Sequence, residues 1–395
     1  MKISKRLDGV SESATLKLNS MVQAMKAQKI DVINFTTGEP DFNVSDGAKA
    51  AVVRALETNQ SKYTPVPGIA ELRQAVADKT NAQQTGLKNP WKSSHVVVSN
   101  GGKQAIFNAL LALLNPGDEV LIPAPYWLSY PEMVKLAGGT PVFIAAPFQQ
   151  NFKITPAQLK SAITPRSKIL ILNSPSNPTG AMYSQAEFRA LGEVIREHRE
   201  LLVISDEIYD RVILGETPFC SFLGANPELA ERTITVNGMS KSAAMTGWRI
   251  GWSVAPAEVT QAMITLQGQS TSGINSLAQW ASLAALREPE ASYNWQVESY
   301  RKRRDIALEI LRKTPKIEVM APEGAFYLFI GVGNFMRDGK RGKNSFEFAE
   351  QLLQSGKVAV VPGSPFGESE FIRISFATDE KTLRDGCVRI TEFLS

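Results

Sequence analysis

From residue 95 to residue 254, short apolar runs alternate with stretches that have a helical pattern. The runs that we expect to form strands are HVVVS (95–99), EVLIP (119–123), TPVFIA (140–145), KILIL (168–172), LLVIS (201–205), TITV (233–236) and IGWSV (250–254). Their apolar residues are continuous, which is typical of strands covered by helices on both faces. Helical patterns lie between them, for instance at 103–114 and 184–200. The alternation predicts an α/β domain with a mainly parallel, doubly wound sheet.

A different order of elements begins near residue 300. A long charged helix is followed by GAFYLFI (324–330), a second helix (345–355), VAVVPG (358–363) and FIRISFA (371–377), which predicts a smaller α+β domain. The residues before about Ser45 are too few to fold alone, so we expect them to complete that domain or to reach a partner subunit. We therefore predict a large domain at 46–298, and an N-terminal arm and small domain at 1–45 and 299–395.

Composition excludes several classes of protein. The net charge is only +4, and the chain has two cysteines, Cys220 and Cys387, without a CxxC motif. Neither a disulfide framework nor a zinc site is indicated, and a reducing cytoplasm is the default compartment. Two histidines leave little material for a histidine-rich metal site. No apolar run approaches the length that spans a bilayer, and no basic patch favours nucleic acid.

Polar clusters follow several of the predicted strands. NGGKQ follows residue 99, SPSNPTG follows 173, DEIYD follows 205 and GMSK follows 237. Ligands of open α/β sheets bind beyond the carboxyl ends of the strands, so these clusters are expected to form one composite site. The chain has no GxGxxG after a strand and no GxxxxGK[ST], so the usual nucleotide motifs are absent.

The stretch NGMSKSAAMTGWRIGW (237–252) sets two charges, Lys241 and Arg249, among small and apolar residues. Burying an ammonium group costs several kcal/mol unless it is paired or its pKa falls. Lys241 is therefore either a lysine whose side chain reaches the surface or a neutral amine that can attack a carbonyl.

The remaining clusters decide between these two interpretations. The Gly101-Gly102-Lys103 turn opens a helix, where backbone N–H groups favour a phosphate. Asp206 could pair with a protonated ring nitrogen, and Tyr209 and Asn177 could bind a phenolic oxygen. Taken singly, these residues could equally be a helix cap, a packed tyrosine and an ordinary turn. Together with a neutral lysine they fit one cofactor, pyridoxal phosphate.

Motifs along nearly the whole chain resemble the class I aminotransferases, which are fold-type-I pyridoxal-phosphate enzymes. The chain is most similar to their bacterial aspartate aminotransferase branch, which includes prephenate and aromatic aminotransferases. The matching stretches, in the order of the family, are TTGEPDF (36–42), KYTPVPGIAELR (62–73), NGGKQAIFN (100–108), APYWLSYPEM (124–133), NSPSNPTGAMY (173–183), SDEIYD (205–210), NGMSKSAAMTGWRIG (237–251), GAFY (324–327), VPG (361–363) and FIRISFA (371–377).

The resemblance implies catalytic roles for three residues. Lys241 resembles the lysine that holds the cofactor as a Schiff base and then moves a proton. Asp206 would keep the pyridine nitrogen protonated. Tyr209, together with Asn177, would bind the phenolic oxygen, and Trp127 resembles the aromatic residue that stacks on the ring.

It also implies residues for the phosphate and the substrate. The phosphate residues would be Gly101, Gly102, Lys103, Ser240 and Arg249, with Tyr63 donated across a homodimer interface. Arg373 would bind the substrate α-carboxylate, with Gly38, Trp127 and Asn177 beside it. Lys103 could instead bind a distal carboxylate of the substrate.

Two departures from the family concern the choice of substrate. VSESAT (10–15) has no basic residue, and QSTSGINSLAQW (269–280) lacks the arginine that some relatives use for a distal carboxylate. That carboxylate is then left to Lys103, Ser13 or Thr15. The resemblance implies transfer of an amino group from an L-amino acid, aspartate first, to 2-oxoglutarate by a ping-pong mechanism. Aromatic, prephenate or broad specificity stays open, as does a pyridoxal-phosphate-dependent lyase.

Overall fold

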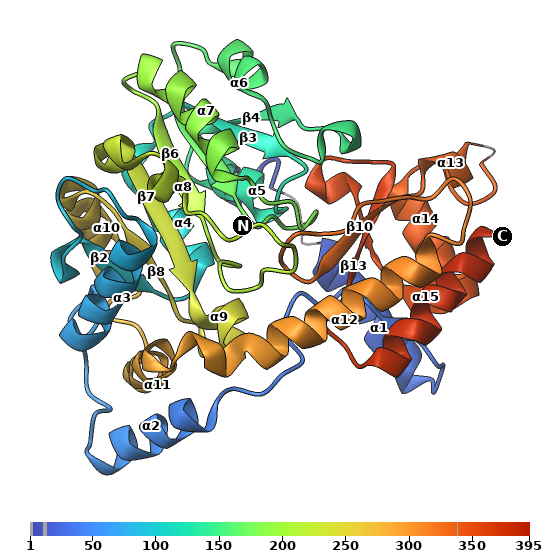
Figure 1. The fold of residues 1–395 in the computed structure, drawn as a ribbon, viewed down its shortest axis with the longest axis horizontal. Coiled ribbons are helices and arrows are strands. Elements are labelled where there is room, and N and C mark those ends of the chain that lie inside the picture. The colour runs from blue at the N-terminus through green and yellow to red at the C-terminus, as the bar shows by residue number, and fades with distance from the viewer. Residues whose placement is uncertain (1–2, 11–13, 338) are drawn as a thin grey trace.

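The computed structural model describes residues 3–10, 14–337 and 339–395. Its largest sheet has seven strands in the order β2–β8–β7–β6–β5–β3–β4 (Figure 1). Their bounds are β2 Val96–Ser99, β3 Glu119–Ala124, β4 Thr140–Ala145, β5 Ser167–Asn173, β6 Leu202–Asp206, β7 Thr233–Gly238 and β8 Gly251–Val254. All neighbours from β7 to β4 are parallel, and β8 is antiparallel to β7 and β2. The predicted α/β fold with a mainly parallel sheet is confirmed.

Helices cover both faces of this sheet, which is why its strands are apolar throughout. Along β5, Leu170 and Leu172 enter one buried cluster, whereas Ile169 and Ile171 enter another on the opposite face. The first cluster includes residues of α3 (Ala70–Gln83), α6 (Pro156–Ala162), α7 (Gln185–Glu197), α8 (Phe222–Ala225) and α11 (Ser276–Arg287). The second includes residues of α4 (Gly102–Leu113), α5 (Ser129–Leu136) and α10 (Ala257–Ser270).

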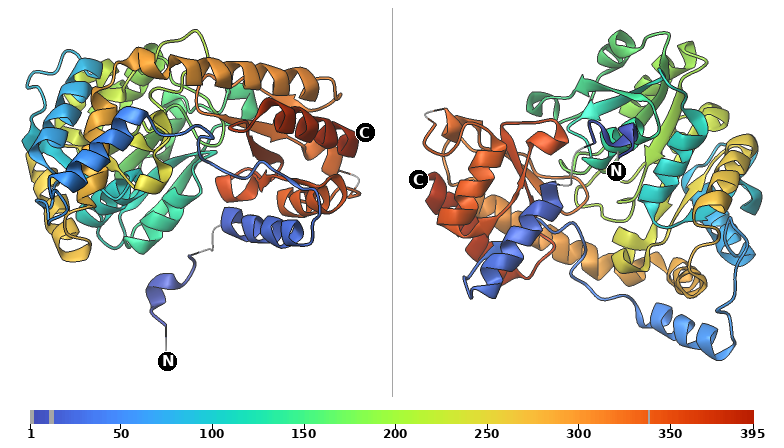
Figure 2. Two further views of the ribbon diagram at one scale, coloured as in Figure 1. Left: turned by 90° about the horizontal axis from the view of Figure 1, so that it is seen from below. Right: turned by 180° about the vertical axis from the view of Figure 1, so that it is seen from behind.

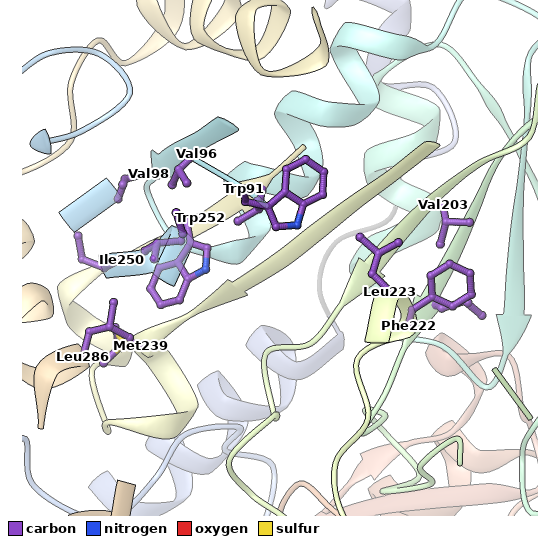
Figure 3. Close-up of a cluster of buried hydrophobic side chains, with 14 of the residues drawn as sticks. Trp91, Val96, Val98, Val203, Phe222, Leu223, Met239, Ile250, Trp252 and Leu286 are labelled. Carbon is purple, nitrogen blue, oxygen red and sulfur yellow. The ribbon is translucent and has the colours of Figure 1, made fainter. Parts of the chain in front are cut away.

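The first cluster anchors the segment that carries the two charges noted in the sequence. Met239 and Ile250 flank that segment and are buried with Trp252 and Val98 (Figure 3). Met239 opens the short helix α9 (Met239–Ser242), and Ile250 directly precedes β8. The core therefore fixes both ends of the loop, while Lys241 is left only partly buried.

A second body contains an antiparallel sheet in the order β12–β13–β10–β9. Its strands are β9 Glu318–Val319, β10 Tyr327–Gly331, β12 Val361–Pro362 and β13 Phe371–Ser375, and its helices are α12 Asn294–Leu311, α13 Gly333–Met336, α14 Ser345–Gln351 and α15 Glu380–Leu394. The N-terminal strand β1 (Ile33–Asn34) pairs in parallel with β11 (Val358–Ala359). Helix α1 (Ala14–Ala27) lies beside this body (Figure 2), and α2 (Asp46–Glu57) packs on α11. The exact residue bounds of the two domains stay a prediction.

Several boundaries differ from the sequence-based prediction, and three of them illustrate how these elements begin or end. The helix expected to reach residue 200 ends at Glu197, where the backbone N–H of His198 caps it by donating to Ile195. The strand expected from residue 324 begins at Tyr327, because Ala325 has a left-handed φ of 58°. The helix expected at 345–355 changes at Leu352 into a π-helical turn that ends at Gly356.

Short 3-10 helices complete the described elements: Lys5–Leu7, Ser93–His95, Phe148–Gln150, Pro227–Arg232, Thr246–Trp248, Glu290–Tyr293 and Ser364–Phe366. Across the ranges that the structure describes, no helix combines the length and the apolar character needed to cross a membrane.

Candidate active site

A cavity of about 510 Å³ lies where the carboxyl ends of β5, β6 and β7 face the second sheet. Most of the site residues expected from the sequence line it: Gly38, Gly102, Lys103, Trp127, Asn177, Asp206, Tyr209, Ser240, Lys241, Arg249 and Arg373. Segments far apart in the sequence therefore meet at one place, as the strand-end rule predicts.

Asp206 is the last residue of β6 and is buried, with 5% of its surface exposed. Its Oδ2 accepts a hydrogen bond of 2.6 Å from the hydroxyl of Tyr130, and its Oδ1 accepts one of 3.3 Å from the backbone N–H of Ile208. Burial raises the pKa of Asp206 to about 6, against the opposing effect of these hydrogen bonds. The carboxyl group is thus held in place with capacity left for a further donor.

Lys241 lies in α9, directly after β7, and its Nζ donates to the carbonyl of Gly38. Burial and, to a lesser extent, the nearby positive charge of Arg373 lower the pKa of Lys241 to about 8, whereas Glu39 opposes the shift. A lysine with a lowered pKa supplies a larger neutral fraction of its amine at a given pH, which is the form that acts as a nucleophile or base.

Arg373 lies on β13 and is buried, with 4% of its surface exposed. Its NH1 donates to Oδ1 of Asn177 (3.0 Å), and its NH2 donates to the carbonyl of Thr36 (2.9 Å). The guanidinium stacks on the ring of Tyr327 at 4.4 Å, and its Nε has no hydrogen-bond partner. A buried guanidinium with an unused donor is suited to a carboxylate.

Two tyrosine hydroxyl groups connect these walls of the cavity. The hydroxyl oxygens of Tyr209 and Tyr327 are 2.9 Å apart, and both residues are buried. Burial raises the pKa of Tyr209 well above its ordinary value, so its hydroxyl stays protonated. A Cβ on Gly38 would lie 3.0 Å from the Tyr327 hydroxyl, which leaves little room there for a larger residue.

The turn before α4 meets Arg249 at the other end of the cavity. Gly101 has a φ of 87°, and a Cβ there would lie 2.6 Å from NH2 of Arg249. Arg249 itself donates to the carbonyls of Thr246 (2.9 Å) and Asn100 (3.4 Å). Helix α4 begins at Gly102, so free backbone N–H groups and a guanidinium face the same region, which is suited to an anion.

Lys103 and Trp127 form the outer wall. The Nζ of Lys103 lies 5.0 Å from the centre of the Trp127 ring. Partial burial lowers the pKa of Lys103, and the positive charge of Arg249 lowers it further. Ser240 is buried beside Lys241 and also lines the cavity.

Tyr63, a predicted site residue, does not line this cavity in the single chain. It is fully exposed and lines a separate hollow of about 460 Å³ with Thr64 and Gly273. Ser13, proposed for a distal carboxylate, lies outside the described residues, and the side chain of Thr15 is not described either.

The cavity also includes residues that the sequence-based prediction did not name, among them Glu39, Tyr130, Thr246 and Tyr327. The hydroxyl of Thr246 donates to the Glu39 carboxylate at 2.8 Å and so joins two segments across the cavity. Tyr130 and Tyr327 stand in stretches that match the family, but a single sequence does not show where a hydroxyl points. Among the described residues, no cluster of three or more His, Cys, Asp or Glu side chains is arranged to hold a metal ion.

Comparison with solved structures identifies the class. The chain superposes on the aspartate aminotransferase of Rhizobium meliloti with a TM-score of 0.95 and 39% identity, covering 100% of this chain and 99% of that one. It superposes on the Thermus thermophilus aspartate aminotransferase with maleate with a TM-score of 0.92 and 39% identity, covering 99% of each. The fold is that of the fold-type-I transferases. The chain belongs to aminotransferase class I and II, whose family model matches residues 30–390.

Sequence relatives agree with this family. The chain is 44% identical to the aspartate/prephenate aminotransferase of Cereibacter sphaeroides, over 99% of this chain and 98% of that protein. It is 40% identical to the aspartate aminotransferase of Bacillus subtilis, over 100% of this chain and 99% of that protein. The chain is therefore a transaminase, as its motifs predict.

Proposed function

We propose that this aminotransferase uses pyridoxal 5'-phosphate to move the amino group of L-aspartate to 2-oxoglutarate in a ping-pong reaction. The observation that carries the proposal is the convergence of Lys241, Asp206 and Arg373 on one cavity. The names of the relatives support aspartate as the donor. The matching structure of the Thermus thermophilus enzyme is a structure with maleate, which is a dicarboxylate.

The residues of the cavity fit the proposed cofactor. Asp206 has capacity for a donor beyond its bonds to Tyr130 and Ile208, which suits a protonated ring nitrogen. The N-terminus of α4 and Arg249 suit a phosphate. Pyridoxal phosphate, when bound, supplies the electron sink that makes the Cα proton of an amino acid acidic.

The protein side chains would then divide the work among themselves. Arg373, which lines the cavity, would bind the substrate α-carboxylate with its guanidinium group and so orient Cα. Lys241 would remove the Cα proton with its neutral amine and would then donate a proton to C4′ of the cofactor. Asp206 would keep a proton on the ring nitrogen. Tyr209 and Asn177 would bind the ring oxygen, and the Trp127 ring would stack on the cofactor.

Recognition of the substrate side chain depends on the outer wall. Lys103 lines the cavity with its Nζ over the Trp127 ring and would bind a distal carboxylate, which supports aspartate. The same aromatic wall would also accept a ring, which supports an aromatic or prephenate substrate. A pyridoxal-phosphate-dependent lyase would use the same cofactor residues. These alternatives differ in the product that they release.

We also infer that the enzyme acts as a homodimer in which Tyr63 reaches the phosphate of the partner. Its full exposure in one chain supports this arrangement, as do the exposed Val53 and Leu56 of α2. Light scattering should then give twice the mass of 43.2 kDa. Tyr63→Phe should weaken cofactor binding. A monomeric wild-type protein, together with an unchanged cofactor affinity in Tyr63→Phe, would contradict the inference.

The first test is a half-reaction spectrum of the protein loaded with pyridoxal phosphate. Single amino acids are added without an acceptor, and we expect aspartate to convert the visible cofactor band to a near-ultraviolet band. Conversion only by aromatic or neutral amino acids would move the substrate elsewhere in the family. Pyruvate release without an oxo-acid acceptor would identify a lyase.

The matched variant is Lys241→Ala, which should take up the cofactor and yet lose the amino-group transfer. Lys153→Ala is the control, because Lys153 forms an ion pair with Glu187 away from the cavity. Near-normal turnover by Lys241→Ala would contradict the proposed role of this lysine.

A further inference from the structure

Tyr130 lines the cavity, yet none of the roles proposed above uses it. It is the second residue of α5 and is buried, with 2% of its surface exposed. It also lines a second cavity of about 20 Å³, so this one residue borders both spaces. A buried polar side chain in this wall is expected to have a specific partner.

The partner of the Tyr130 hydroxyl is the Asp206 carboxylate. The hydroxyl donates to Oδ2 at 2.6 Å, which is the length of a charge-assisted O–H···O⁻ bond. Oδ1 receives only the long bond of 3.3 Å from the backbone of Ile208. Since each carboxylate oxygen can accept two hydrogen bonds, both oxygens keep capacity for a further donor. The short bond from Tyr130 is therefore the stronger of the two contacts that hold the carboxylate in place.

The ring of Tyr130 makes a second contact in the same wall. Its edge meets the ring of Trp127, with centroids 5.4 Å apart and planes at 89°. The backbone N–H of Tyr130 also donates to the carbonyl of Trp127 at 2.9 Å. One residue thus touches both the carboxylate expected beside the ring nitrogen and the indole expected against the ring face.

We propose that Tyr130 is a positioning residue of this aminotransferase, whose hydroxyl orients the Asp206 carboxylate and keeps it ionised while its ring edge orients Trp127. The inference rests on the proposed function, because it requires the pyridine nitrogen of pyridoxal phosphate beside Asp206. The hydroxyl only donates a hydrogen bond and transfers no proton, since burial raises the pKa of Tyr130 well above its ordinary value.

A direct consequence concerns the proton on the ring nitrogen. The hydrogen bond from Tyr130 lowers the pKa of Asp206 against the effect of burial. The charge of Lys241 also lowers the pKa of Asp206. Tyr209 is a second phenol close to Tyr130. Without the Tyr130 bond the carboxylate becomes a stronger base, so it competes better for the proton of the pyridinium. The ring nitrogen then loses its proton more readily.

The test compares Tyr130→Phe with the wild type after both are loaded with nitrogen-15-labelled pyridoxal phosphate. Phenylalanine keeps the ring against Trp127 and removes only the hydroxyl. The matched control is Tyr183→Phe, which removes another buried hydroxyl from the wall of the small cavity, where it accepts the backbone N–H of Ile154 at 2.9 Å. The readouts are the nitrogen-15 NMR signal of the ring, the pH profile of kcat and the affinity for the cofactor.

We expect the ring-nitrogen signal of Tyr130→Phe to move toward the neutral pyridine value. The acid limb of the kcat profile should move to higher pH, and kcat near neutral pH should fall about tenfold, as expected for loss of a hydrogen bond to a charged group. Tyr183→Phe should keep the wild-type signal and profile. If Tyr130→Phe fails to fold, 3-fluorotyrosine at position 130 should shift the titration of the ring nitrogen in the opposite direction, because its more acidic hydroxyl donates more strongly.

Unchanged nitrogen signal, pH profile and affinity in Tyr130→Phe would overturn the inference and leave the proposed function intact. An equal loss of kcat in Tyr130→Phe and Tyr183→Phe would also overturn it, because the loss would then follow from the removal of any buried hydroxyl group in this wall. A wild-type protein that shows no bound cofactor would overturn both proposals together.

Discussion

At the scale of single residues, the burial of Asp206 and Lys241 in the cavity is unfavourable. Burial raises the pKa of Asp206 to about 6 and lowers the pKa of Lys241 to about 8. Both shifts disfavour the charged forms, so both reduce the stability of the empty protein near neutral pH. A bound cofactor that pairs with both groups would recover this free energy. The site is thus less stable than an apolar core of the same size.

Asp206→Asn should therefore stabilise the protein without cofactor while abolishing its function. The folded-state pKa of Asp206 lies above its unfolded value of 3.8, so the native state binds more protons between pH 3.8 and about 6. Stability from this group is lost as pH rises through that window and stays lost above it. Removing the charge should raise the free energy of unfolding by about 1–3 kcal/mol near neutral pH.

Denaturant unfolding of the two cofactor-free proteins across that pH range measures this effect. Asp78→Asn, at an exposed helix position, is the control and should change little. Transaminase activity of Asp206→Asn should fall by at least about a hundredfold. A variant that is less stable than the wild type at neutral pH would contradict the argument.

Arg373 gives the second prediction at this scale. Arg373→Lys keeps the charge but loses the fork that bonds Asn177 and the carbonyl of Thr36. KM should rise by about 10–100-fold for every amino-acid substrate, because the α-carboxylate is common to all of them. Steady-state kinetics with aspartate and with an aromatic amino acid decide the matter. A rise confined to dicarboxylates would mean that Arg373 binds the distal group.

At the scale of elements, the sequence predicted where most strands lie but not which strands pair with each other. The runs that became β3, β5 and β6 were recognisable because both faces of each strand are buried, which makes them apolar throughout. Asp206 was recognisable because it directly follows such a run, and Lys241 because it is a charge among small and apolar residues a few positions after another. The bond from Tyr130 to Asp206 was not, since it joins residues 76 apart and depends on how α5 packs on the sheet. Local pattern carries no information on such contacts.

Packing between β8 and α4 provides a prediction about elements. A Cβ on Gly251 would lie 2.3 Å from the backbone nitrogen of Gly102 and 2.5 Å from the backbone carbon of Gly101. Gly251→Ala should therefore push the start of α4 away from Arg249 and weaken cofactor binding by about tenfold or more, since overpacking shifts the backbone. A Cβ on Gly247 meets nothing within 4 Å, so Gly247→Ala is the matched control. Cofactor titration followed by fluorescence measures both, and equal affinities would show that the turn tolerates the displacement.

At the scale of the whole molecule, two connections join the body of the large sheet to that of the second sheet. One is the segment between β1 and α2, and the other leads from α11 into α12 (Figures 1 and 2). Within the first, Asp41 bonds Arg303 of α12 at 2.8 Å. The segment also carries Gly38 and Glu39, so its position sets one wall of the cavity. The sequence predicted that the N-terminal residues join the later part of the chain, but not these contacts.

Glu288 links the two connections through hydrogen bonds. Its carboxylate accepts a hydrogen bond of 2.6 Å from Ser45 and one of 2.7 Å from the hydroxyl of Tyr293. The same Ser45 oxygen accepts the backbone N–H of Ala48 at 3.2 Å and so caps α2. Glu288→Ala would release both connections at once, whereas Glu288→Gln can still accept one bond and donate another. A matched pair of variants is therefore available at one position.

Glu288→Ala should reduce stability by about 1–3 kcal/mol, because it leaves two partly buried hydroxyl groups without their charged acceptor. Hydrogen exchange should rise at 36–46 and 290–300, where the chain passes between the two bodies, and remain unchanged in β5 and β6. KM should rise more than kcat falls, since the wall that carries Gly38 would be less fixed while Lys241 and Asp206 stay on the large sheet. Glu288→Gln should lie between the alanine variant and the wild type. Equal exchange in all three proteins would mean that the Asp41–Arg303 pair alone fixes the connections, and Arg303→Gln would then become the variant that loosens them.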